Sequence, residues 1–174
     1  MTDTVAPTCT LRAFAMPGTT AFSVIRLTNA SLANEACAVV RQSITHCCTL
    51  DHHGEAAVLS AWLANKTPDN VAAWMMAPGA MAWGAMRQSD LVGFALLARG
   101  ALALCYAVPE VLRQGVGRGL LEAAEAGASD AGLDALALES TRTAEPFYRH
   151  HGYVPGGPVQ HWAGLQALPM RKPL

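Results

Sequence analysis

Three glycines alternate with other residues at Gly115, Gly117 and Gly119, after an apolar segment and immediately before an amphipathic helix pattern. The first turn of a helix carries N–H groups without intrahelical partners and the positive end of the helix dipole. Glycines at this point permit a positive φ and remove side chains that would keep an anion away. The segment therefore predicts one of two structures: a nest for a phosphate or pyrophosphate, or a tight turn that lets the helix pack closely.

Two common phosphate-binding loops do not fit this segment. The Walker A loop needs Lys followed by Ser or Thr after its last glycine, whereas Leu120 and Leu121 follow Gly119. The dinucleotide-binding fingerprint needs a third glycine three residues after the second, and that position is also Leu120. Both classes of nucleotide loop are thereby excluded.

The composition limits the classes of protein. A chain of 174 residues with 52% hydrophobic and 14% charged residues can bury the core of one domain, which we place at residues 21–174. The net charge of −1 provides no basic field for a nucleic acid. No apolar run reaches the ~18 residues of a membrane span, and residues 1–20 lack an export signal, so we expect a loose N-terminal extension and no membrane. Five irregularly spaced cysteines favour reduced thiols and a cytoplasmic protein.

Hydrophobic periodicity predicts a mixed α/β domain. The expected order is a strand, two helices, three antiparallel strands, a helix, a strand, a short helix and closing strands. Strands are expected at 22–27, 81–87, 91–98, 101–108 and 133–139, and helices at 31–44, 57–63, 115–130 and 143–151. Ser31 is the expected N-cap of the first helix, and Gly132 lies where the C-terminal cap of the third helix is expected. Residues 71–76 fit neither period.

The glycine segment resembles the loop of the GNAT superfamily of acyl-CoA-dependent N-acetyltransferases. The family pattern is an apolar strand, V-x-P, then Gln/Arg-x-x-Gly-x-Gly/Ala and a helix with Leu-Leu. Here Ala107–Pro109 precedes Leu112–Gly117, and Leu112 stands where Gln or Arg is usual. A register that begins at Gln114 restores a polar residue but lengthens the distance from Pro109 by two. The first register is preferred because the spacings to Pro109 and to the Leu-Leu pair both fit.

A second motif supports the same resemblance. The family pattern A-x-x-F-Y-x-x-x-G-F/Y matches Ala144–Tyr153 at every fixed position, and the ending LPMRKPL resembles the last strand of the family. The resemblance covers roughly residues 22–174. It implies a mixed, mostly antiparallel central sheet of six to seven strands, splayed between the fourth and fifth and flanked by about four helices.

The resemblance also implies an activity. The family transfers an acetyl group from acetyl-CoA (coenzyme A) to a primary amine by direct attack in a ternary complex, so we expect a small-molecule or protein amine as acceptor; a homodimer is compatible with this expectation. The alternative is a non-catalytic acyl-CoA-binding module that senses or regulates. A purely structural α/β domain would leave the glycine nest unexplained.

Specific residues follow from the resemblance. Tyr148 is the expected general acid, against the simpler reading that it packs beside Phe147, and the N–H of Ala107 is expected to polarise the thioester carbonyl. Thr141 stands where many relatives carry an Asn that contacts the cofactor. The expected cofactor contacts are Cys105, Tyr106, Ala107, Val108, Leu112, Arg113, Gln114, Gly115, Val116, Gly117, Arg118 and Thr141.

The general base and the acceptor site remain open. Glu139, Glu110, His150, His151 and a water chain are candidates for the base. The residues that we expect to orient the amine are His46, His52, His53, Glu55, Glu139 and His161. Segment 46–55 also gathers zinc-type ligands, but their spacing matches no C-x₂-C or H-x₃₋₅-H pair with a second half elsewhere. A polar connection between helices is therefore favoured over a metal site.

Overall fold

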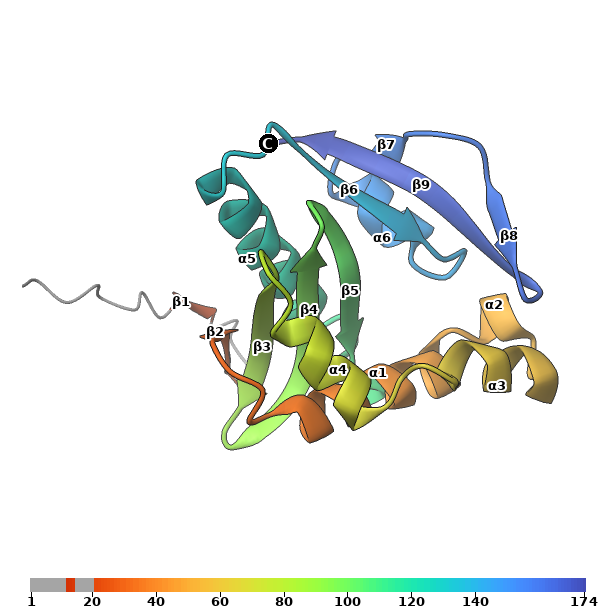
Figure 1. Cartoon of the computed structure of the whole chain (residues 1–174), viewed down its shortest axis with the longest axis horizontal. Helices are drawn as coiled ribbons and strands as arrows, with labels where there is room; N and C mark the ends of the chain where they lie inside the picture. The colour runs from red at the N-terminus through yellow and green to blue at the C-terminus, as the bar shows by residue number, and fades with distance from the viewer. Residues whose placement is uncertain (1–11, 15–20) are drawn as a thin grey trace, which may run out of the picture.

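The computed structural model of the chain describes residues 12–14 and 21–174. Within this part, one mixed sheet has the order β1-β2-β3-β4-β5-β6-β9-β7, with β8 beside β9 (Figure 1). The strands are β1 (Arg12–Phe14), β2 (Phe22–Leu27), β3 (Met81–Arg87), β4 (Asp90–Ala98), β5 (Ala101–Ala107), β6 (Ala135–Ser140), β7 (Val154–Pro155), β8 (Gln160–Trp162) and β9 (Leu165–Pro173). The helices are α1 (Ala33–Cys47), α2 (Thr49–His52), α3 (Ala56–Leu63), α4 (Pro68–Met75), α5 (Val116–Asp130), α6 (Glu145–His150) and the 3₁₀-helix η1 (Pro109–Val111).

The sheet is antiparallel except at one junction. Strands β2 to β5 form an antiparallel meander, β6 pairs antiparallel with β9, and β5 and β6 are parallel. A parallel pair needs a crossover connection, and α5 supplies it. The predicted fold class is confirmed: the six longer strands are the expected ones, and β1, β7 and β8 are short additions.

Helices cover both faces of the sheet. Helix α5 packs on β3 and β4, while α1 packs on β4 and β5 from the other face. Each helix buries the apolar stripe that its sequence predicts: Ile44 on α1 and Leu120 on α5 have no exposed surface. The core therefore lies on both sides of β4, whose residues from Leu91 to Leu97 are all buried.

Several local predictions need correction. Ser31 is not the N-cap of the first helix, because α1 begins at Ala33 and has no side-chain cap. Segment 46–55 is not a simple connection either: α1 continues to Cys47, and α2 follows after one residue. The ambiguous residues 71–76 belong mostly to α4, which Thr67 caps by accepting the Asn70 N–H at 3.2 Å. These changes bring the α-helices of the described chain to six rather than about four.

Other predictions at the helix and chain ends have mixed outcomes. Gly132 ends α5 as predicted: its φ is +81°, and the following Leu133 N–H donates to the Ala128 carbonyl at 3.0 Å. Of the expected N-terminal extension, residues 1–11 and 15–20 lie outside the described residues, and Arg12–Phe14 pairs with β2. Within the described residues, no helix combines the length and apolarity needed to cross a membrane.

The functional feature of the fold is the early separation of β5 from β6. The two strands pair only at Ala101 with Ala137 and at Leu102 with Leu138, and they then diverge (Figure 1). Strand β5 nevertheless stays paired with β4 as far as Ala107. The sheet therefore splits between the fourth and fifth of its longer strands, as predicted.

Candidate active site

A cleft of about 810 Å³ opens where β5 and β6 separate. Its walls come from the end of α1, from β5 and η1, from the start of α5, from the end of β6, and from α6. This volume is within the range of small-molecule and cofactor sites, which are concave and mostly apolar. Two segments far apart in the chain, the glycine loop and the Phe-Tyr helix, thus meet at one site.

The backbone of β5 presents hydrogen-bonding groups to this cleft. The Val108 N–H donates to the Val92 carbonyl of β4 at 3.0 Å. Because N–H groups alternate in direction along a strand, the N–H of Ala107 points away from β4 and toward the space that β6 has left. A free strand edge at this position can bind an extended ligand and can polarise a carbonyl.

A different structural feature accounts for glycine at each of the three positions of the loop. Gly115 is the N-cap of α5 and has a φ of +89°, a conformation that favours glycine. A Cβ atom at Gly119 would lie 3.1 Å from the Phe22 ring, so this glycine permits close packing of α5 on β2. At Gly117 a Cβ atom would lie 3.6 Å from the Phe147 ring, which is ordinary contact. Neither backbone strain nor packing requires Gly117, and its missing side chain leaves the cleft open.

Tyr148 lies on α6 and is buried at the cleft. Its ring contacts Phe147 edge-on, with centroids 5.2 Å apart, and its hydroxyl is a hydrogen-bond neighbour of the Cys105 thiol on β5. Burial, followed by the proximity of Cys105, raises the pKa of Tyr148 well above 10, so the hydroxyl stays protonated. Burial likewise raises the pKa of Cys105 to about 12.

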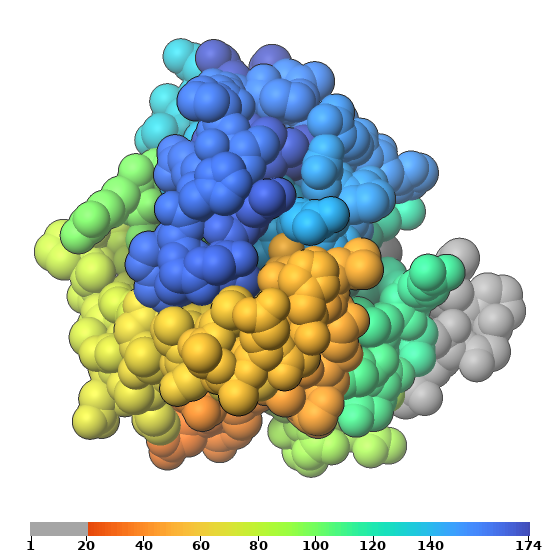
Figure 2. Space-filling view, turned by 90° about the vertical axis from the view of Figure 1, so that its right-hand side faces the viewer, coloured from red at the N-terminus to blue at the C-terminus, as the bar shows by residue number. Residues whose placement is uncertain are grey.

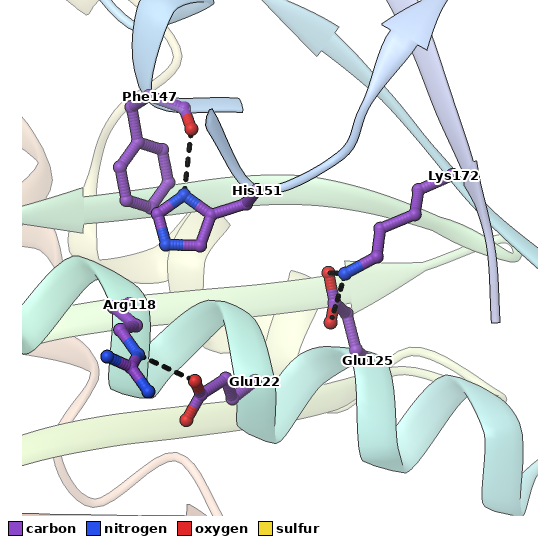
Figure 3. A network of polar contacts seen from close by, with 6 residues as sticks. All are labelled: Arg118, Glu122, Glu125, Phe147, His151 and Lys172. Atoms are coloured by element: carbon purple, nitrogen blue, oxygen red, sulfur yellow. Dashed lines mark hydrogen bonds and ion pairs between the residues drawn. The ribbon is translucent and has the colours of Figure 1, made fainter. Parts of the chain in front are cut away.

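The imidazole of His151, the residue that follows α6, is held in the lining of the same cleft. Its Nδ1 donates to the Phe147 carbonyl at 2.8 Å, because a carbonyl can only accept. Figure 3 shows the ring beside Phe147, above the turn of α5 that carries Arg118 and Glu122. Arg118 pairs with Glu122 at 2.7 Å and lines the cleft, so positive charge lies near the start of α5.

A residue near the cleft that sequence reasoning missed is Asp51 on α2. Its buried carboxylate accepts hydrogen bonds from the Arg142 N–H at 2.7 Å, from the Thr143 N–H at 3.2 Å and from the Thr143 hydroxyl at 2.5 Å. These groups form the turn that leads into α6 and Tyr148. Its partners are more than 90 residues away in the chain, so no local pattern could have identified it.

The predicted cofactor contacts divide into two groups. Those that line the cleft are Cys105, Tyr106, Ala107, Leu112, Arg113, Gly115, Gly117, Arg118 and Thr141. Val108 and Val116 are buried in the core, and the side-chain amide of Gln114 donates to the Glu110 carbonyl at 2.8 Å. Of the candidates for the base, Glu139, His150 and His151 line the cleft, whereas Glu110 is exposed outside this lining.

Most of the predicted acceptor residues lie outside the lining of the cleft. His46, His53, Glu55 and His161 are exposed. His52 is buried on α2, where its Nδ1 accepts the Gly54 N–H at 3.1 Å. Of this set only Glu139 lines the cleft, so a role of the others in orienting an amine stays a prediction. The described residues contain no group of three His, Cys, Asp or Glu side chains that is placed to hold a metal ion.

Comparison with known proteins identifies the class. Residues 48–174 match the family model described as an acetyltransferase (GNAT) domain. The chain therefore belongs to the GNAT acetyltransferase family, whose members use acetyl-CoA. No curated protein matches the chain.

Solved structures show the same fold. A GCN5-related N-acetyltransferase from Rhodopseudomonas palustris is 25% identical over 99% of this chain and 100% of its own, with a TM-score of 0.73. The PaiA N-acetyltransferase from Thermoplasma acidophilum, in complex with coenzyme A, is 17% identical over 88% of this chain and 99% of its own, with a TM-score of 0.70. The ribosomal-protein-S18-alanine N-acetyltransferase from Escherichia coli is 16% identical over 87% and 93%, with a TM-score of 0.60.

Proposed function

We propose that this protein transfers an acetyl group from acetyl-CoA to a primary amine by direct attack in a ternary complex. Family membership supports acyl transfer in general. The observation that carries the specific proposal is the early separation of β5 and β6. It opens a single cleft whose lining includes both Ala107 and Tyr148.

The residues of the cleft fit coenzyme A. The start of α5 offers N–H groups and a positive dipole end to a pyrophosphate, and the Cβ position of Gly117 is free for the ligand. Arg113 and Arg118 add positive charge to the same wall. The edge of β5 offers alternate backbone groups to the extended pantetheine arm.

When bound, acetyl-CoA supplies the acetyl group as a reactive thioester. The Ala107 N–H is oriented to donate a hydrogen bond to a carbonyl oxygen in the gap, where it would stabilise developing negative charge. Tyr148 holds a proton on its buried hydroxyl and can donate it toward a departing sulfur. We propose Glu139, which lies near the end of β6 and lines the cleft, as the carboxylate that accepts a proton from the amine; His150 and His151, in the same lining, are the alternatives.

The deciding experiment combines acetyl-CoA with a panel of primary amines and follows release of free thiol. We expect amine-dependent thiol release that falls strongly in Tyr148→Phe. Binding of coenzyme A without thiol release for any amine would favour the non-catalytic acyl-CoA-binding module instead.

A further inference from the structure

The cleft continues past the strand gap to a second end, which we call the α1 end. It is formed by Ser43, Cys47, Cys48, Tyr106, Val111 and Leu112. Tyr106 belongs to the face of β5 opposite to Ala107. Ala107 lies across from Gly93, whose Cβ position faces Val116 and Leu120 of α5, so Tyr106 must face α1. The part of the α1 end that comes from α1 and Tyr106 is therefore on the other side of β5 from α5, while Leu112 belongs to the loop that leads into α5.

The polar atoms of the α1 end are neutral. A thiol and a phenol are protonated at neutral pH, and burial extends this to alkaline pH, because it raises the pKa of Cys48 to about 12 and also raises that of Tyr106. The Ser43 hydroxyl is a hydrogen-bond neighbour of the Cys47 thiol, whose pKa burial also raises. The buried carboxylate closest to Tyr106 is that of Asp51, and both of its oxygens accept hydrogen bonds from Arg142 and Thr143.

The charged groups of the cleft lie elsewhere. Arg113 lies between η1 and α5, and Arg118 is in the first turn of α5. His150 ends α6 and His151 follows it, while Glu139 is the last residue but one of β6. None of the six residues that define the α1 end carries a charged side chain, and the lining residue Arg113 follows Leu112 in the chain. The exposed carboxylate of Glu110 acts electrostatically on Cys47, one of the residues of this end.

We infer that the α1 end binds the acceptor, and that the acceptor is a primary amine with one apolar substituent, aryl or alkyl, rather than a polyamine or an amino sugar. The inference rests on the proposed function. Sulfur and aromatic surfaces contact apolar groups favourably. A second ammonium group would be desolvated here without a carboxylate partner, and burial of an unpaired charge is strongly unfavourable. The negative charge of Glu110, which acts on Cys47, matches the single positive charge of such an amine.

A kinetic comparison tests this inference. The wild-type protein, with acetyl-CoA saturating, is assayed with 2-phenylethylamine, spermidine and kanamycin, and thiol release is followed. We expect kcat/KM to be at least about tenfold higher for 2-phenylethylamine, because apolar contacts of this size change specificity by roughly this factor. Calorimetry with 2-phenylethylamine in the presence of coenzyme A should show a binding heat that spermidine does not give.

Two variants locate the acceptor. Leu112 lines the α1 end with 48% of its surface exposed, and Leu50 on α2 is 62% exposed outside the lining of the cleft. Leu112→Asp should lower kcat/KM for 2-phenylethylamine relative to that for spermidine, whereas the matched control Leu50→Asp should leave the ratio unchanged. Equal or better turnover of spermidine or kanamycin by the wild type would overturn the inference. Coenzyme A binding with no thiol released from any of the amines would instead overturn the proposed function.

Discussion

Asp51 binds Thr143 through both its backbone N–H and its hydroxyl, although the two residues are 92 positions apart. The same carboxylate accepts the Arg142 N–H, so one buried side chain of α2 holds the turn that begins α6. Gly164, in the turn between β8 and β9, lies against Val58 of the neighbouring α3. Figure 2 shows the C-terminal segment (blue) resting on the helices that follow α1 (orange to yellow). The segment after α1 is therefore fixed to the part of the fold that carries Tyr148.

Substitution of Asp51 should weaken both stability and catalysis. Asp51→Ala leaves two backbone N–H groups and a hydroxyl without their acceptor, which we expect to cost about 2–4 kcal/mol of unfolding free energy. Asp51→Asn keeps the shape and one acceptor oxygen and should cost about half as much. Urea denaturation measures both changes, and kcat should fall while KM for acetyl-CoA changes little. Asp130→Asn, at the exposed end of α5, is the control. Equal stability of Asp51→Ala and Asp130→Asn would contradict this role.

Two substitutions of Gly117, one by Glu and one by Ala, test whether the glycine loop binds coenzyme A. Gly117→Glu should abolish binding of coenzyme A, because it fills the space beside Phe147 and adds a negative charge, while the helix start tolerates a carboxylate well. Gly117→Ala should fold normally because its Cβ makes only ordinary contact. Calorimetry with coenzyme A and thermal unfolding separate the two effects. The assignment of the loop fails if Gly117→Glu binds coenzyme A with wild-type affinity.

Gly93→Ala is expected to affect packing rather than coenzyme A binding, and it therefore serves as a comparison for the Gly117 variants. A Cβ atom there would lie 2.8 Å from both Leu120 and Val116, so β4 and α5 must move apart. We expect a loss of about 1–3 kcal/mol of unfolding free energy, the usual cost of overpacking. Coenzyme A binding measured below the unfolding transition should persist. A stable Gly93→Ala protein would mean that α5 adjusts its position freely.

The predictable parts of this molecule are those that local sequence specifies. The glycine loop, the Ala144–Tyr153 motif and the longer strands were identified because helix starts, hairpins and apolar periods depend on residues close in the chain. Gly132 was correctly placed because a positive φ at a helix end favours glycine. The cap at Ser31 was wrong because α1 begins two residues later, at Ala33, without a side-chain cap.

The unpredictable parts depend on tertiary contacts. Segment 46–55 is rich in polar residues, so it resembles a connection, yet Asp51 and His52 are buried there. The burial of Asp51 is compensated by hydrogen bonds to residues that only the fold brings near. For the same reason the sequence could not show that the α1 end of the cleft is neutral. That property arises because the fold brings uncharged side chains from α1, β5 and η1 together in one part of the cleft.

Tyr148→Phe tests the proposed acid. Loss of the hydroxyl should lower kcat about 10²-fold, within the usual range for acid–base groups, and should leave KM for acetyl-CoA nearly unchanged. The matched control is Tyr153→Phe: this tyrosine is also buried on the same motif, but its hydroxyl lies beside Glu125 and Lys172 rather than in the cleft (the Glu125–Lys172 pair is drawn in Figure 3). Only Tyr148→Phe should reduce turnover. Equal losses in both variants would indicate a packing role for Tyr148.

The buried thiol of Cys48 predicts how stability depends on pH. Burial raises the pKa of Cys48 from 9.0 to about 12 in the folded state, whereas the unfolded chain loses this proton near pH 9. The folded state therefore binds more protons between these values, and the free energy of unfolding should fall as the pH rises from 9 to 12, by at most about 1.4 kcal/mol per pH unit for this group. Below pH 9 the contribution is fully present.

Cys48→Ala should make the decline shallower. Val40→Ala, a substitution at a fully buried apolar residue of α1, should instead lower stability by a constant amount and keep the wild-type slope. Urea denaturation at half-unit intervals from pH 7 to 11 measures these slopes. Parallel curves for the wild type and Cys48→Ala would show that the thiol is ionised as easily in the folded protein as in the unfolded chain, and the α1 end would then not be neutral at alkaline pH.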